Sequence, residues 1–250
     1  MAGKNKSKLI RPFICSNSTG NPRRSSDETR PINERTMKNC LILLFALCVN
    51  IAAAQITDNW TLKKDNDGVK MYTADYKNSR IKALKAECEF DATPAAVTAA
   101  IMDIKNSKQW IYSTETAYVV KRVSPSDIYY YTLIKMPLTV SNRDYVGHLV
   151  VHQDPKTKVV TINGSCVEGF VPRKKGAIRV LNSPAKWVLT PESTNRVKVV
   201  YTLHADPGGS IPAGLVNMFA TKAPSETFQK LKAELKKPMY KHVKLGYVKD

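Results

Sequence analysis

Hydrophobic and polar residues alternate through much of the chain between positions 60 and 205, and this period of two is typical of β-strands with one buried face. The alternation stops at short stretches rich in Gly, Pro, Asn and Asp, such as Asn66-Asp67-Gly68, which are turn signals. Because such short turns join consecutive strands, we expect an antiparallel sheet. The predicted strands span residues 60–64, 69–75, 80–90, 117–123, 128–136, 143–153, 158–166, 177–190 and 196–205.

Two segments have the hydrophobic spacing of helices instead. The first begins at Thr93-Pro94, where Thr is a good N-cap and Pro suits the first helical position, and it fades near Asn106. The second follows the junction at 206–217, Asp-Pro-Gly-Gly-Ser-Ile-Pro-Ala-Gly-Leu-Val-Asn, and runs nearly to the C-terminus. We expect a kink or break before Pro224, because Pro removes a helical hydrogen bond. An antiparallel sheet with helices on one face makes this an α+β fold.

The first 54 residues carry a different pattern. Residues 1–36 are polar and lack hydrophobic periodicity, so we expect them to be disordered or untranslated. Residues 37–54 have the layout of a secretory signal peptide, with a positive start at Met37-Lys38, a short apolar run, and a small-residue cleavage site at Ala52-Ala53-Ala54. This interpretation predicts a start at Met37, cleavage after Ala54, and export to the periplasm or the extracellular space. One domain would then span 55–240, followed by a C-terminal tail at 241–250.

The chain is strongly basic, with a formal net charge of +18 from 39 Lys and Arg against 21 Asp and Glu. The charges of the mature part are scattered and mixed in sign, so two interpretations remain open: a solvated surface, or attraction to anionic membrane surfaces and ligands. The sequence has no zinc-finger spacing, aromatic-basic RNA motif or Gly-rich clamp, and we therefore expect no nucleic-acid partner. The oligomeric state is not predicted.

No catalytic constellation is evident in the sequence. The nucleophile-elbow, zinc-protease, P-loop and dinucleotide motifs are all missing. His148 and His152 would lie about 13 Å apart on one strand, too far for one metal ion. Asp144, Glu168 and Asp206 have no evident partner. These absences favour a binding protein that needs no cofactor and no metal.

Cys88 and Cys166 are the cysteines of the predicted mature part, and both lie in predicted strands. An exported protein allows them to form a disulfide, whereas buried strand positions favour free thiols. Both states remain open.

Two segments are specific when they are taken together. Residues 136–146, Met-Pro-Leu-Thr-Val-Ser-Asn-Arg-Asp-Tyr-Val, resemble the signature of the steroidogenic-acute-regulatory-protein-related lipid transfer (START) domain. The junction at 206–212, with Asn217, resembles that family's link between the last strand and the C-terminal helix. Trp110 and the run 187–191, Trp-Val-Leu-Thr-Pro, also occur in the family's order, so the resemblance covers about 58–237.

The resemblance implies a helix-grip fold, in which a curved antiparallel sheet wraps around a long C-terminal helix, here with the kink expected at Pro224, and a shorter internal helix. In this family a lipid-sized tunnel lies between sheet and helix. The implied function is binding of a lipid or another hydrophobic small molecule, with or without transfer, and without covalent catalysis. The alternatives are an enzyme of the cyclase or hydrolase kind on the same scaffold, and a scaffold with a filled core that binds no ligand. Arg173, Lys174 and Lys175 in the loop 170–176 leave two interpretations open: transient contact with the anionic head groups of a membrane surface, or a solvated loop.

The resemblance also indicates which faces of the strands matter. Some sterol-binding members carry an Arg and an acid in the tunnel; the matching positions here are Leu149 and Tyr130, so a sterol preference is not carried over. The parity of these positions predicts inward-facing phenols that would hydrogen-bond a ligand head group, and the alternative is that Tyr130 and Tyr145 only pack the core. Arg143 and Asp144 are expected to brace the strand and its loop. The predicted ligand-binding residues are Tyr130, Thr132, Ile134, Tyr145, Leu149, Trp187, Tyr201, Leu203, Leu215, Phe219 and Phe228.

Overall fold

The structure of the protein is a computed structural model that describes residues 59–250 except 138–139, 210 and 212, and only the backbone of 213–215 and 217–221. The predicted upstream segment 1–36 and signal peptide 37–54 lie outside the described residues. No helix in the described part is long and apolar enough to cross a membrane.

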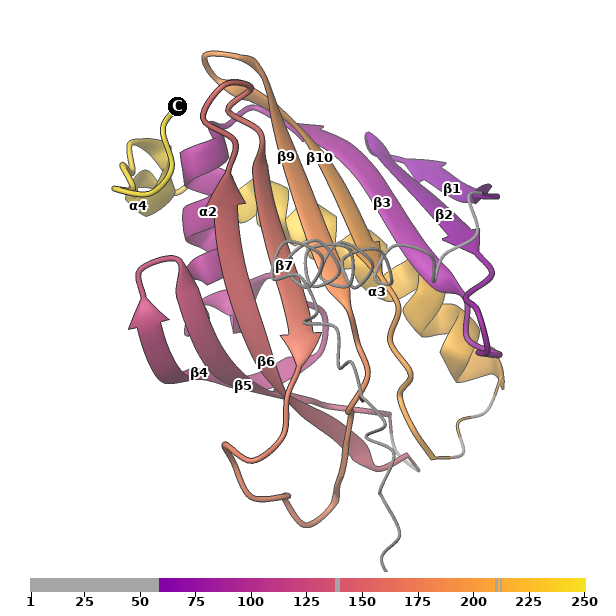
Figure 1. Ribbon diagram of the computed structural model, residues 1–250. Helices are drawn as coiled ribbons and strands as arrows, with labels where there is room; N and C mark the ends of the chain where they lie inside the picture. Colours follow the sequence, from indigo (N-terminus) through magenta and orange to yellow (C-terminus); the bar gives the residue numbers. More distant parts are fainter. Residues whose placement is uncertain (1–58, 138–139, 210, 212) are drawn as a thin grey trace, which may run out of the picture. The chain divides into compact units, whose positions relative to one another are not determined.

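Ten strands of the described part form one sheet (Figure 1). In chain order they are β1 (Thr61–Asn66), β2 (Val69–Ala74), β3 (Ala83–Phe90), β4 (Thr114–Ser124), β5 (Asp127–Ile134), β6 (Asn142–Gln153), β7 (Val160–Cys166), β8 (Ala177–Arg179), β9 (Ala185–Ser193) and β10 (Arg196–Leu203). The order across the sheet is β1-β2-β3-β10-β9-β7-β6-β5-β4, with β8 beside β6. Pairing is antiparallel as predicted, except that β8 runs parallel to β6.

The turn between β1 and β2 shows how local sequence produces this pairing. Asp67 and Gly68 both have positive φ, 53° and 76°. Two such residues in a row twist the chain in the direction that a two-residue hairpin needs, and Asp-Gly is among the sequences that tolerate it. The hairpin predicted at Asn66-Asp67-Gly68 is confirmed.

The single strand predicted over 177–190 is wrong, because β8 and β9 are separate strands. β8 pairs with the start of β6, whereas β9 lies between β7 and β10, so residues 180–184 must cross from one position to the other. Within this crossing, Val180-Leu181 and Asn182-Ser183-Pro184 interrupt the alternation, which marks a turn but not the new pairing partner. Periodicity alone therefore does not show that the pairing partner changes.

The helices of the described part are α2 (Pro94–Met102), α3 (Ala213–Glu234) and α4 (Pro238–Lys241), with a short 3-10 turn η1 (Ser107–Gln109). α2 begins as predicted, since Thr93 Oγ1 accepts a hydrogen bond from Ala96 N at 3.2 Å and Pro94 occupies the first turn. α3 continues through Pro224, so the two expected helical pieces are one element without a break. Pro224 removes one hydrogen bond from α3, and the remaining turns stay joined.

α2 and α3 lie on the same face of the sheet (Figure 1). The main hydrophobic core lies between them and the sheet, and it includes Val97, Ile101, Phe228 and Leu231 from the helices. A smaller cluster of Tyr131, Leu133 and Val146 lies on the opposite face, where Val167, Val171 and Ala177 pack against it. We call the face toward α2 and α3 the inner face, and the opposite one the outer face.

The C-terminal residues 241–250, predicted as a tail, fold back onto α2. Asp250 Oδ1 accepts a hydrogen bond from Ala95 N at the start of α2, at 2.9 Å. Lys249 bonds to Gln153 through both its backbone N–H and its carbonyl, and Val248 is buried in the main core. The end of the chain thus caps α2, which has no acidic residue in its own first turn.

Candidate functional site

Strand register places the predicted phenols on the inner face. Residues directly opposite each other in an antiparallel pair share a face. Thr132 lies opposite Tyr145, and Tyr130 lies opposite Gly147, which in turn lies opposite Cys166. These residues form one inward-facing group at the β5–β6–β7 part of the sheet. We call Tyr130, Thr132 and Tyr145 the hydroxyl cluster, and the thiol of Cys166 lies beside them.

Gly147 decides where the ring of Tyr130 lies. A Cβ added at Gly147 would be 2.3 Å from Tyr130 Cε1 and 2.7 Å from its hydroxyl oxygen, so the ring lies directly over the glycine. Tyr145 meets this ring edge-on, with ring centroids 5.7 Å apart and planes at 86°. The absent side chain at Gly147 thus makes room for two perpendicular phenols in one place.

The hydroxyl groups of the cluster are hydrogen-bonded to one another. Burial raises the pKa of both Tyr130 and Tyr145. The bond between them raises the pKa of Tyr130 further but counteracts the rise at Tyr145, and a bond with Thr132 acts on Tyr145 in the same sense. The hydroxyl groups of Tyr130, Thr132 and Tyr145 therefore lie close enough to interact with one another.

Three further predicted residues form an aromatic group beside the cluster. Trp187 lies opposite Tyr201 across β9 and β10, with ring centroids 4.1 Å apart. Phe228 of α3 approaches both rings, at 5.5 Å from Trp187 and 6.0 Å from Tyr201. Electrostatic interaction between Tyr201 and Tyr145 contributes to the raised pKa of Tyr201, which places the two groups near each other.

The three inner-face tyrosines combine two properties that rarely occur together. Tyr130, Tyr145 and Tyr201 each keep part of their surface accessible. Burial is nevertheless the largest cause of the raised pKa of all three phenols. This combination is expected of side chains that face a space enclosed by the protein, where a small molecule fits but bulk water is distant.

The other predicted site residues are spread along the same face. Ile134 lies at the end of β5 opposite Arg143, Leu149 is buried opposite Ile128, and Leu203 lies opposite Leu84. The side chains of Leu215 and Phe219 lie outside the described residues. Cys166 was not predicted, although its spacing from Val160 and Ile162 on β7 carries the same inward parity.

Arg143 holds the junction that precedes α3. Its guanidinium donates to the carbonyl oxygens of Pro207 at 3.1 Å, Gly208 at 2.8 Å and Ser141 at 2.7 Å. Burial lowers the pKa of this guanidinium. The two segments that resemble the START signature, 136–146 and 206–212, therefore bind each other directly in this chain.

Asp144 forms an ion pair with Arg179, a partner that the sequence did not indicate. It accepts two hydrogen bonds from Arg179, at 2.9 Å each, and one from Tyr131 at 3.1 Å. Arg179 also donates to the carbonyls of Val171 and Pro172, in the loop between β7 and β8. Arg143 and Asp144 thus brace the strand and its loops as expected, one on each face of β6.

The remaining titratable residues do not converge on a reactive centre. Among the described residues, no group of three or more His, Cys, Asp and Glu could hold a metal ion. His148 bonds Asp127 at 2.7 Å and stacks on Tyr129. Both Cys88 and Cys166 are free thiols, and burial raises the pKa of Cys88 to about 12 and that of Cys166 to about 11.

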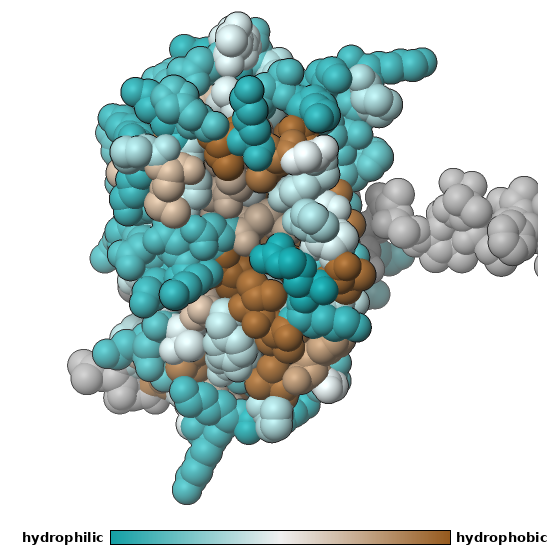
Figure 2. All heavy atoms as spheres, turned by 90° about the vertical axis from the view of Figure 1, so that its left-hand side faces the viewer, coloured by the Kyte–Doolittle hydropathy of each residue, from teal (hydrophilic) through white to brown (hydrophobic). Residues whose placement is uncertain are grey.

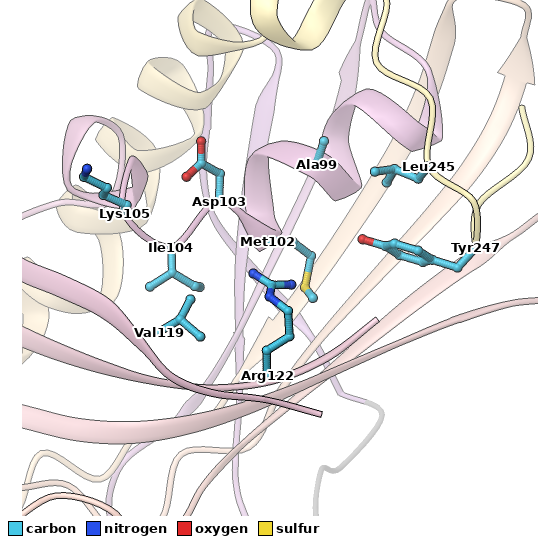
Figure 3. Close-up of a pocket in the computed structure, with 9 residues that line it drawn as sticks. All are labelled: Ala99, Met102, Asp103, Ile104, Lys105, Val119, Arg122, Leu245 and Tyr247. Atoms are coloured by element: carbon cyan, nitrogen blue, oxygen red, sulfur yellow. The ribbon is translucent and has the colours of Figure 1, made fainter. Parts of the chain in front are cut away.

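A separate groove of about 360 Å³ lies between α2, β4 and the C-terminal segment. Figure 3 shows Arg122 extending from β4 toward α2, with Leu245 and Tyr247 along the side formed by the C-terminal segment. Hydrophobic surface interrupts the hydrophilic side chains on this side of the protein (Figure 2), where β4 exposes Val119 and Val123. None of the predicted ligand-binding residues lines this groove.

Comparisons with known proteins agree with this architecture. The model of the START domain family matches residues 48–240. An uncharacterized protein of Pseudomonas aeruginosa is 30% identical over 197 residues, which are 79% of this chain and 96% of that protein. The phosphatidylcholine transfer protein of Mus musculus is 25% identical over 178 residues, 69% of this chain and 82% of its own.

Solved structures share the fold. A fragment of the STAR-related lipid transfer protein from Xanthomonas axonopodis is 28% identical, with a TM-score of 0.66, and covers 72% of this chain and 100% of the fragment. Human StAR-related lipid transfer protein 5 is 16% identical with a TM-score of 0.62, covering 81% of this chain and 96% of that protein.

Proposed function

The chain belongs to the START domain family, and on this premise we propose that it binds a lipid or another hydrophobic small molecule between the inner face of the sheet and α3. Transfer of that molecule between membranes is part of the proposal, because relatives of this chain are lipid transfer proteins. Binding would rest on burial of apolar ligand surface, worth about 25 cal/mol per Å².

One observation carries the proposal. Tyr130, Tyr145 and Tyr201 belong to the inner face and are only partly buried, although burial raises the pKa of each phenol. A core that was simply filled would leave these rings without accessible surface. An apolar wall with a few converging hydroxyls is the usual lining of a small-molecule site.

The proposed activity involves no covalent chemistry. On strands β5, β6, β7, β9 and β10, the described residues that share the face of the tyrosines include no His, Asp or Glu. Within that part of the chain, therefore, no group is available as a general acid or base near neutral pH.

Loading from a membrane surface is supported by the loop between β7 and β8. Arg173, Lys174 and Lys175 are exposed there, together with Phe170, which stacks on Tyr129 at 4.4 Å. Basic residues attract anionic lipids, and an exposed aromatic side chain suits the interface. Flotation with phosphatidylglycerol vesicles should retain the chain, and replacement of the three basic residues by Gln should release it.

Export through residues 37–54 is also a proposal. N-terminal sequencing of the protein recovered from the periplasm or medium should begin at Gln55. A recovered protein that retains residues 1–36 would contradict it.

The main experiment is native mass spectrometry of the full chain expressed in cells, followed by extraction of any bound lipid. Transfer is measured with a fluorescent lipid moving from donor to acceptor vesicles. Cys166→Leu adds volume on the inner face and should reduce the bound lipid. Ser165→Leu adds the same side chain to the neighbouring exposed position and should not. Protein that remains free of ligand across a panel of lipids would refute the proposal.

A further inference from the structure

The inner face carries almost no charge. Pairing from β2 through β3, β10, β9, β7 and β6 to β5 places Met71, Ala86, Tyr201, Trp187 and Ile162 in one row of opposed residues. Every second residue on these seven strands shares their face. On these seven described strands, Arg143 is the one Asp, Glu, Lys, Arg or His of that parity. The two edge strands add one basic residue each to this face, because Lys64 of β1 lies opposite Met71 and Arg122 of β4 lies opposite Ile128.

Arg143 is already engaged at the end of the sheet. Its guanidinium donates to three main-chain carbonyls, two of which belong to the junction before α3. Gly209 also lies within reach, since a Cβ there would be 3.7 Å from Arg143 Nη2. The guanidinium of Arg143 thus contacts the junction before α3 and not the hydroxyl cluster.

The other charged side chains near the inner face contact groups outside the hydroxyl cluster. Lys64 donates to Ser225 Oγ of α3 at 3.3 Å. Arg122 of β4 lines the separate groove of Figure 3. On α3, Glu226 pairs with Lys222 and Lys230 along the helix, at 3.8 and 3.9 Å. The sequence of residues 210–221, Ser-Ile-Pro-Ala-Gly-Leu-Val-Asn-Met-Phe-Ala-Thr, contains no ionisable side chain, so the undescribed part of α3 adds no charge.

What the inner face does offer is a set of hydroxyl groups in one place. Thr132 lies opposite Tyr145, and the ring of Tyr130 lies over Gly147 and edge-on to Tyr145, so three hydroxyl groups meet here and can donate a hydrogen bond to a ligand. A neutral carbonyl or hydroxyl oxygen accepts such a bond at little cost of desolvation. A phosphate would have to lose its water without gaining a counter-charge, which is strongly unfavourable.

Resting on the function proposed above, we propose that the ligand is a neutral lipid, whose head offers a hydroxyl or an ester carbonyl to Tyr145 and carries no phosphate. According to this proposal, the chain prefers a neutral lipid to a phospholipid, although one of its relatives is a phosphatidylcholine transfer protein. The chain would select its ligand in two ways: the nearly uncharged inner face excludes charged head groups, and Tyr145 forms a hydrogen bond with the head of a neutral lipid.

The test uses the full chain incubated with vesicles of phosphatidylethanolamine, phosphatidylglycerol and dioleoylglycerol in equal amounts. Native mass spectrometry then identifies the bound lipid. We expect dioleoylglycerol to be enriched at least about tenfold over either phospholipid, which corresponds to a modest difference in binding free energy. A chain loaded mainly with phospholipid would overturn the neutral-lipid proposal and leave the proposed function standing. A chain that binds none of the three would overturn both.

A matched pair of variants tests the hydrogen bond itself. Tyr145→Phe removes one oxygen from the cluster and should lower the affinity for dioleoylglycerol about tenfold, as the loss of one buried hydrogen bond does. Tyr129→Phe removes the same atom from the outer face of β5 and should leave binding unchanged. Thermal unfolding of both variants shows whether each is folded. Equal affinity of the folded Tyr145→Phe variant and the unaltered chain would refute the role of Tyr145.

Discussion

The ion pair between Asp144 and Arg179 allows a sharp prediction about stability. The side chains are 1% and 3% exposed, and two hydrogen bonds of 2.9 Å join them. Asp144→Asn keeps the shape of the side chain but removes its charge, so a buried guanidinium remains without a counter-ion. Removing one partner of such a pair costs about 3–5 kcal/mol of unfolding free energy. That is a large part of the stability of a typical domain.

The assay is urea unfolding of the full chain, followed by tryptophan fluorescence and circular dichroism. We expect the midpoint to fall in Asp144→Asn while the slope m is unchanged, because the same surface becomes exposed on unfolding. Glu168→Gln is the control. Glu168 and Arg173 form a pair of 3.0 Å in the adjoining loop, but they are 60% and 67% exposed, so its loss should cost less than about 1 kcal/mol.

A double replacement separates charge from packing. Asp144→Leu with Arg179→Met removes both charges together, and apolar substitutes for a buried pair are often neutral or stabilising. The double variant should therefore be more stable than Asp144→Asn. The reasoning is refuted if Asp144→Asn costs no more than Glu168→Gln, or if the double variant is the least stable of the three.

Three further predictions concern single side chains. Gly147→Ala forces Tyr130 to move and should lower the unfolding free energy by about 1–3 kcal/mol, whereas Gly164→Ala, with no contact closer than 3.3 Å, should cost less in the same urea assay. Burial lowers the pKa of His204 in the folded protein, so the unfolded state binds the proton more readily. The contribution of His204 to the unfolding free energy is therefore fully present above the pKa of the unfolded state, and it is lost as the pH falls through the pKa of the folded state. Urea unfolding at about pH 7 and about pH 5 should show this loss, and His204→Gln should show less of it. Burial raises the pKa of Cys88 to about 12, so iodoacetamide at about pH 8 should label it slowly in folded protein and quickly in urea, and fast labelling of folded protein would contradict the structure.

The family signature has a physical explanation in these contacts. Arg143 and Asp144 are neighbours in sequence, and their side chains leave opposite faces of β6. Arg143 binds the junction before α3 on the inner face, while Asp144 binds Arg179 on the outer face. Arg143 and Asp144 therefore connect the end of the sheet to two loops. Substitution of either residue should lower the stability of the fold, and any effect on ligand binding should follow from that loss.

The sequence by itself determined what depends on a few neighbouring residues. The hairpin at Asp67-Gly68 and the cap at Thr93 follow from local backbone geometry, and both occur where they were predicted. The inward parity of Tyr130 and Tyr145 also follows from the period of two along a strand, once the direction of one residue is assigned. Whether those residues contact a ligand stays a prediction.

Only the tertiary structure decided which distant residues meet. Arg179 is 35 positions from Asp144, and Asp250 is 155 positions from the N–H of Ala95 that it caps. No local signal specifies such partners, because they depend on the order of the strands and on the path of the chain between them. The split of the strand predicted over 177–190 has the same cause. Asn182-Ser183-Pro184 interrupts the alternation, but the exchange of one neighbouring strand for another is a property of the assembled sheet.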